Sequence, residues 1–65
     1  MTIENFKAGL DILVGCGATG FCIHAQHDVF YCGPDLASVP QEKRDQLYGI
    51  GWAWDEGCES WRAFT

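Results

Sequence analysis

Two cysteines and two histidines fall close together in the chain and are the first candidates for chemistry: Cys22, His24, His27 and Cys32. Zinc is held by thiolate and imidazole ligands that converge tetrahedrally. Cys22 and His24 would share one strand face beside His27, whereas Cys32 would point to the opposite face. The sequence also lacks the paired C-x-x-C spacing that structural zinc sites usually show. The pattern therefore favours ordinary strand cysteines and a turn histidine, and we expect no metal and no cofactor.

Catalysis is also disfavoured by the residues present. A Cys–His nucleophile pair needs a concave pocket, which 65 residues can hardly enclose beside a core. Residues 15–20 (GCGATG) superficially resemble a phosphate-binding loop, but they follow a predicted helix and lack the lysine. The carboxylates of Asp55 and Glu56 fall in a predicted turn, where water would solvate them. We therefore predict no catalytic residues and a protein that is not an enzyme.

Length and charge restrict the class of protein further. A 65-residue chain has room for a single domain, residues 1–65. Its 48% hydrophobic and 14% aromatic content is too high for a disordered regulator. Nine acidic against four basic residues give a net charge of −5, which repels nucleic acid and anionic membranes and favours basic partners. We expect a monomer that does not bind nucleic acid directly.

The location of the protein follows from what the sequence lacks. The apolar stretch 9–20 is interrupted by Asp11 and is shorter than the ~20 residues that a membrane span requires. No basic segment followed by an apolar run marks a secretory signal. We expect a cytoplasmic protein with reduced cysteines.

Two helices can be predicted from capping and spacing. Thr2 is a suitable N-cap, and Gly15 and Gly17 are suitable terminators, for a helix with one apolar stripe: Ile3, Phe6, Leu10, Leu13 and Val14. The second helix is expected from about Val39 to Tyr48, with Ser38 as its cap, a proline in the first turn and Gly49 at its end.

Each helix is followed by a predicted hairpin. Residues 21–25 and 29–32 read as strands, and we place Gln26-His27 at the centre of their turn. Residues 52–54 and 58–64 read as the second pair, separated by the turn residues 55–57. The expected fold is α+β: a small antiparallel sheet of two hairpins covered by two helices, in the order α-ββ-α-ββ.

Aromatic and acidic residues supply the candidate binding surface. Trp61 is expected in the core. Trp52 and Trp54 would share one strand face and are left open between core and surface, and Tyr31 is a further candidate for an exposed interface anchor. Acidic residues cluster at predicted turns and at the final strand, where they either solvate the surface or form a patch that fits a basic groove. The predicted partner-binding residues are Asp28, Tyr31, Asp35, Trp54, Asp55, Glu56 and Glu59.

The segments 27–31 (HDVFY) and 47–55 (LYGIGWAWD), with Trp61 and Phe64, resemble small phage and prophage proteins. Small acidic phage proteins of this kind include anti-CRISPR inhibitors, which bind Cascade-type surveillance complexes and block target DNA. The resemblance implies a non-catalytic protein in the bacterial host cytoplasm. It would bind a type I CRISPR effector, or another host protein or protein–RNA complex with a basic surface, and block target DNA binding through an acidic, DNA-mimicking surface. A phage protein that modulates another host factor and a small zinc-bound structural domain are the alternatives.

Overall fold

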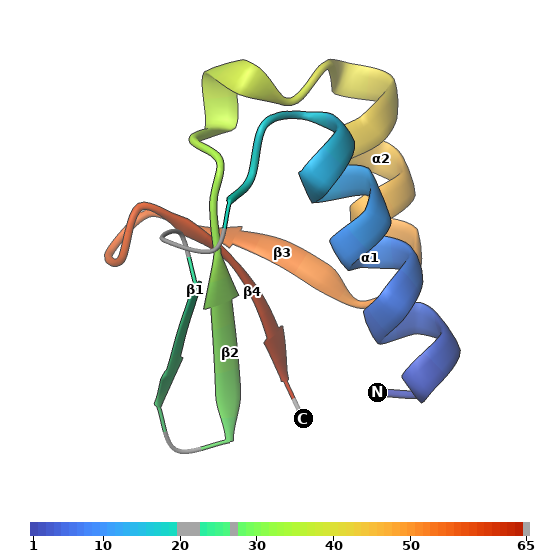
Figure 1. Cartoon of the computed structure of the whole chain (residues 1–65), viewed down its shortest axis with the longest axis vertical. Helices are drawn as coiled ribbons and strands as arrows, with labels where there is room; N and C mark the ends of the chain where they lie inside the picture. The colour runs from blue at the N-terminus through green and yellow to red at the C-terminus, as the bar shows by residue number, and fades with distance from the viewer. Residues whose placement is uncertain (20–22, 27, 65) are drawn as a thin grey trace.

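A computed structural model of the chain describes residues 1–19, 23–26 and 28–64 (Figure 1). Within these residues two α-helices, a short 3-10 helix and four strands follow one another along the chain. Their bounds are α1 (Ile3–Gly15), β1 (Ile23–Gln26), β2 (Val29–Cys32), η2 (Leu36–Ser38), α2 (Gln41–Gly49), β3 (Trp52–Asp55) and β4 (Ser60–Phe64). None of the described helices is long and apolar enough to cross a bilayer.

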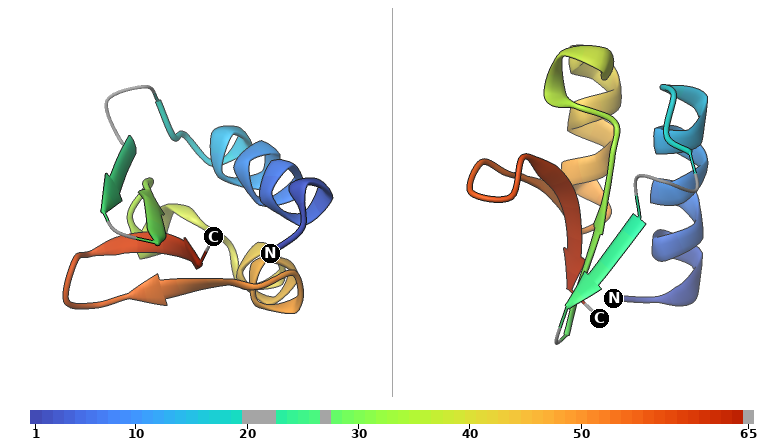
Figure 2. Two further views of the ribbon diagram at one scale, coloured as in Figure 1. Left: turned by 90° about the horizontal axis from the view of Figure 1, so that it is seen from below. Right: turned by 60° about the vertical axis from the view of Figure 1, so that its left-hand side comes forward.

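The described strands form one antiparallel sheet in the order β1-β2-β4-β3. The α+β class predicted from the sequence is therefore confirmed. Paired residues place Phe30, Ala63 and Trp52 in one row across the sheet, on the same face. Phe6 of α1 packs on Phe30 and Trp52, so α1 covers this face. Tyr48 of α2 packs on Trp61, which shares this face with Ala63, so both helices lie on one side of the sheet (Figure 2). No described helix covers the other face, which we call the uncovered face.

The predicted start and end of α1 are confirmed, but its apolar stripe was partly wrong. The Thr2 hydroxyl accepts a hydrogen bond from the Asn5 N–H at 3.1 Å, as a capping side chain should. Ile3 and Val14 are 84% and 62% exposed, because the buried face of the helix is centred on Gly9 and Leu13 instead.

Gly9 has a specific steric role in this packing. A Cβ atom added at Gly9 would lie 2.0 Å from Nε1 of Trp52, so only glycine lets the helix approach the indole. The Trp52 indole N–H donates to the Asn5 carbonyl at 3.2 Å. The indole is thus buried and hydrogen-bonded at the same time, which is how a buried tryptophan avoids an unsatisfied donor.

The predicted start of the second helix was wrong. Ser38 is not its cap, because it is the last residue of η2. The Asp35 side chain accepts a hydrogen bond from the Ser38 N–H at 3.2 Å and caps the start of η2. Val39 is extended, as a residue before proline prefers, so it cannot enter the helix. α2 therefore begins at Gln41, with Pro40 as N-cap and no side-chain capping bond.

The predicted register of the first hairpin was also wrong. Gln26 pairs with Val29, so the centre of the turn lies one residue later than Gln26-His27. Each strand residue consequently pairs two positions away from the predicted partner, and Phe30 lies opposite Ala25. A shift of two residues preserves the side-chain alternation, so Phe30 and Cys32 still share a face. His27 itself lies outside the described residues.

Two tryptophans anchor the centre of the core. Trp52 and Trp61 are almost fully buried, together with Leu13, Val39 and Leu47. The prediction that Trp61 belongs to the core is confirmed. Trp54 lies beside Trp61 in the same row as Cys32, at a centroid distance of 5.7 Å and an interplanar angle of 70°. The half-buried Trp54 ring is therefore packed against a fully buried neighbour.

Candidate partner-binding surface

A depression at one end of the sheet brings four of the seven predicted binding residues together. It has a volume of about 530 Å³ and lies where the segment containing η2 meets the β3–β4 turn. In Figure 1 these are the yellow-green helical turn and the orange turn. The lining residues are Asp35, Leu36, Ala37, Trp54, Glu56 and Glu59. We call this surface the Trp54 depression.

The Asp35 side of the depression is built by a local cap. Oδ1 of Asp35 accepts hydrogen bonds from the Ser38 backbone N–H and from the Ser38 hydroxyl. These bonds fix the carboxylate at the start of η2, where it shares the Ser38 N–H with the backbone carbonyl of Asp35. Leu36 and Ala37 follow and form an aliphatic wall.

Arg44 supports this wall from α2. Its guanidinium donates to the carbonyl oxygens of Leu36 and Val39, each at 2.7 Å. Both of these Arg44 N–H groups therefore bond to backbone carbonyls and not to a carboxylate. Arg44 is not among the residues that line the depression. The contact ties η2 to α2 and so fixes the position of the aliphatic wall.

The opposite side of the depression is formed by the β3–β4 turn. Glu56 and Glu59 are exposed, and Glu59 has a left-handed backbone with φ of 51°. Within residues 1–19, 23–26 and 28–64, no arginine or lysine forms a salt bridge with Asp35, Glu56 or Glu59. The depression therefore concentrates three carboxylates around an aromatic ring.

Asp55 was predicted beside Glu56, but its neighbours are different. Strand alternation places it on the uncovered face, opposite to Trp54. Its carboxylate accepts from the Cys58 N–H at 3.1 Å and pairs with Arg62 at 3.1 Å. The Cys58 N–H and the Arg62 guanidinium lower the pKa of Asp55 below its ordinary value. Asp55 thus shapes the turn and holds Arg62.

Tyr31 also lies on the uncovered face, in the same row as Arg62. A hydrogen bond with the Cys58 side chain raises the pKa of the Tyr31 phenol. Asp28 is exposed and precedes β2, at the end of the strand remote from Cys32 and therefore from the Trp54 depression. Tyr31, Asp28 and Asp55 do not join the site that Trp54 forms.

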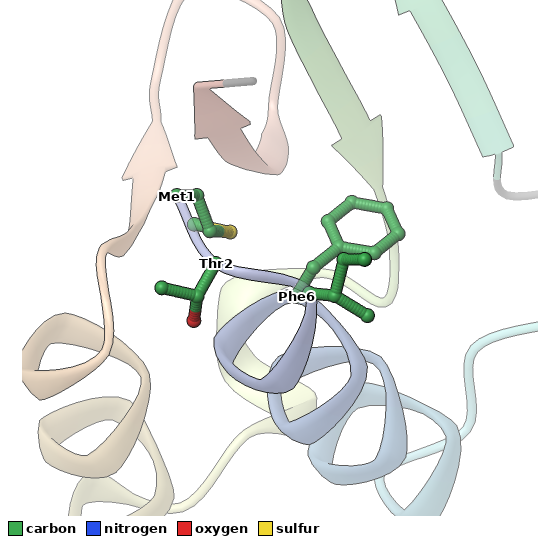
Figure 3. A pocket seen from close by; sticks show the side chains of 4 residues that line it. Met1, Thr2 and Phe6 are labelled. Carbon is green, nitrogen blue, oxygen red and sulfur yellow. The ribbon is translucent and has the colours of Figure 1, made fainter.

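Sequence reasoning missed an apolar hollow beside the start of α1. It has a volume of about 220 Å³ and is lined by Met1, Thr2, Ile3 and Phe6 (Figure 3). A second hollow, of about 620 Å³, also includes Met1 and Thr2 and reaches Phe64, which is 56% exposed. The sequence pattern did not indicate it, because Ile3 fits the apolar stripe of α1 and Phe64 fits the alternation of β4.

The zinc candidates of the sequence cannot be assembled from the described residues. Cys22 and His27 lie outside them, and of His24 only the backbone is described. Cys32 is buried against the core beneath the helices. Among the side chains that the structure describes, no three potential ligands converge on one point.

Comparison with known proteins adds no relative. No family model, no curated protein and no solved structure matches this chain. The resemblance to small phage proteins therefore stays a prediction, and the chemistry of the Trp54 depression carries the functional argument.

Proposed function

We propose that this protein is a non-catalytic inhibitor that binds a basic surface of another macromolecule through the Trp54 depression. The observation that carries the proposal is the gathering of Asp35, Glu56 and Glu59 around Trp54, from two segments about twenty residues apart in the chain. A rigid aromatic group at the centre of a polar rim is the usual arrangement of an interface anchor.

Electrostatics favours a partner that ordinarily binds nucleic acid. The net charge of −5 steers the chain toward positive surfaces, and the three carboxylates take the place of phosphates. Together with the resemblance in the sequence, this favours a type I CRISPR surveillance complex in a bacterial host. The inhibitor would occupy a groove that otherwise holds target DNA.

The proposal is tested by phage plaquing on bacteria that carry an active type I CRISPR system matched to the phage. Expression of the wild-type chain should restore plaquing, and the double variant Glu56→Gln/Glu59→Gln should restore it much less. The matched control is Asp11→Asn/Glu42→Gln, which removes two exposed acids elsewhere and changes the net charge equally. Circular dichroism establishes that both variants fold.

Binding of the purified effector complex completes the test. The wild-type affinity should fall as salt rises, and it should fall more for the wild type than for the depression variant. Equal plaquing and equal affinity for the two double variants would disprove a role for the depression. No rescue and no binding in any type I system, with folded protein, would instead direct the search to another basic host factor.

A further inference from the structure

We infer that the Trp54 depression is a pocket for an arginine side chain of the partner protein. The inference rests on the proposed function, since it specifies which group of the basic partner the depression receives. It goes beyond general charge attraction because the depression combines the Trp54 ring, an aliphatic wall and an acidic rim.

The Trp54 ring favours a cation independently of the carboxylates. The face of a tryptophan ring attracts a cation more strongly than the other aromatic side chains do. The Trp54 ring is half-buried, is held by Trp61 at 5.7 Å and lines the open depression. Its position is therefore fixed before a partner arrives, which lowers the entropic cost of binding.

The rim selects the same charge from two sides. Asp35 lies at the start of η2, while Glu56 and Glu59 lie on the β3–β4 turn. A guanidinium can lie flat on an indole and direct several N–H donors outward in one plane, whereas an ammonium is a compact point charge. The aliphatic wall of Leu36 and Ala37 suits the methylene groups of a long side chain.

The chain contains its own example of this recognition on the uncovered face. There the Arg62 guanidinium lies 5.2 Å from the centroid of the Phe64 ring and pairs with Asp55 at 3.1 Å. An aromatic ring and a carboxylate thus hold one arginine within the molecule. The Trp54 depression presents a larger ring and more carboxylates, without a salt bridge from any described lysine or arginine.

The test uses N-acetyl-arginine amide as the probe and the full chain as the protein. Titration is followed by the three tryptophan indole N–H resonances in ¹H–¹⁵N spectra. We expect a saturating shift of the Trp54 resonance, with little change at the buried Trp52 and Trp61. N-acetyl-citrulline amide, which has the same shape but no charge, should bind at least several-fold more weakly, and N-acetyl-lysine amide should be weaker than the arginine probe.

Variants locate the probe. Glu56→Gln and Glu59→Gln should each weaken arginine binding by roughly two- to fivefold, and Asp11→Asn/Glu42→Gln should not. Trp54→Leu should remove the binding, and unchanged dispersion of its spectrum would show that it folds. Equal binding of citrulline, tighter binding of lysine, or no saturating shift at Trp54 would overturn the inference.

The outcomes separate this inference from the proposed function. If the arginine probe fails but Glu56→Gln/Glu59→Gln still loses partner binding, the acidic surface acts without an arginine pocket. If the probe binds at Trp54 but no basic partner is inhibited, the pocket is real and the proposed function is wrong.

Discussion

The two faces at the β3–β4 end of the sheet carry the same kinds of residue in opposite states. On the uncovered face, Asp55 is paired with Arg62, which also lies over Phe64. On the helix-covered face, Asp35, Glu56 and Glu59 surround Trp54 without a salt bridge from the described residues. The first set therefore stabilises the fold through an internal ion pair. In the second set Asp35 also caps η2 through Ser38, but no described cation neutralises the three carboxylates.

The comparison shows that the number of acidic residues is a poor guide to a binding surface. Asp55 and Glu56 are neighbours in sequence, yet strand alternation and the turn send them to different surroundings. The two residues differ because the Asp55 carboxylate bonds to the Cys58 N–H and to Arg62, whereas Glu56 lines the Trp54 depression. A carboxylate that already accepts a hydrogen bond from a backbone N–H and forms an ion pair with a guanidinium gains less binding free energy from a basic partner.

The largest effect should come from the support beneath the depression. Trp61 is fully buried between Trp54 and Tyr48, so Trp61→Ala should lower the free energy of unfolding by about 3–5 kcal/mol. Trp54→Ala should cost less than about 2 kcal/mol, because that ring is only half-buried. Urea unfolding followed by far-UV circular dichroism measures both changes. Equal losses would show that Trp54 is a core residue, and Trp54 would then not differ from the buried Trp61 as a surface residue.

A smaller effect should appear in the pH dependence of stability, to which Asp55 on the uncovered face contributes. The folded-state pKa of Asp55 is lowered, so its contribution to stability is present above the unfolded pKa of about 3.9 and is lost as pH falls through the folded value. Asp55→Asn should therefore be less stable than wild type at neutral pH, and the difference should shrink as pH falls from about 4 toward the lowered folded-state pKa. Urea midpoints across this range provide the measurement.

The matched control for the pH experiment is Glu56→Gln, which leaves the Asp55–Arg62 pair intact. At neutral pH it should lose much less stability than Asp55→Asn does. If the two variants lost the same stability, the Asp55–Arg62 pair would contribute nothing specific to the fold.

Much of the fold could be predicted because it depends on local rules. Residues close in the sequence were enough to predict three features: the Thr2 cap, the end of the first helix at its glycines, and the alternation of side chains along β2. The start of α2 could not be placed correctly, because Ser38 satisfies its own N–H through Asp35, and this competition is not visible in the spacing of either residue. The hairpin register failed for a similar reason, since the turn lacks a sequence that fixes its length.

The candidate site was predicted only in part for a different reason. Trp54, Glu56 and Glu59 were predicted as binding residues from their types and places in the sequence, and the structure brings them together at one depression. That Asp35 joins them depends on η2 lying against the far hairpin, a contact between distant segments. That Asp55 and Tyr31 turn away depends on which sheet face the helices cover, which alternation alone leaves undecided.

The smallest effect should come from Glu59, where fold and binding oppose each other. Its left-handed backbone, with φ of 51°, is unfavourable for glutamate and is tolerated better by asparagine. Glu59→Asn should therefore raise the free energy of unfolding by a few tenths of a kcal/mol, up to about 0.5 kcal/mol, while it weakens arginine binding. Glu56→Gln should weaken binding without this gain, and its stability should stay within about 0.5 kcal/mol of wild type. A Glu59→Asn protein that is both less stable and unchanged in binding would place Glu59 with the structural carboxylates, beside Asp55. A gain in stability with a loss of binding would show that the turn holds a strained backbone in order to present its carboxylate to a partner.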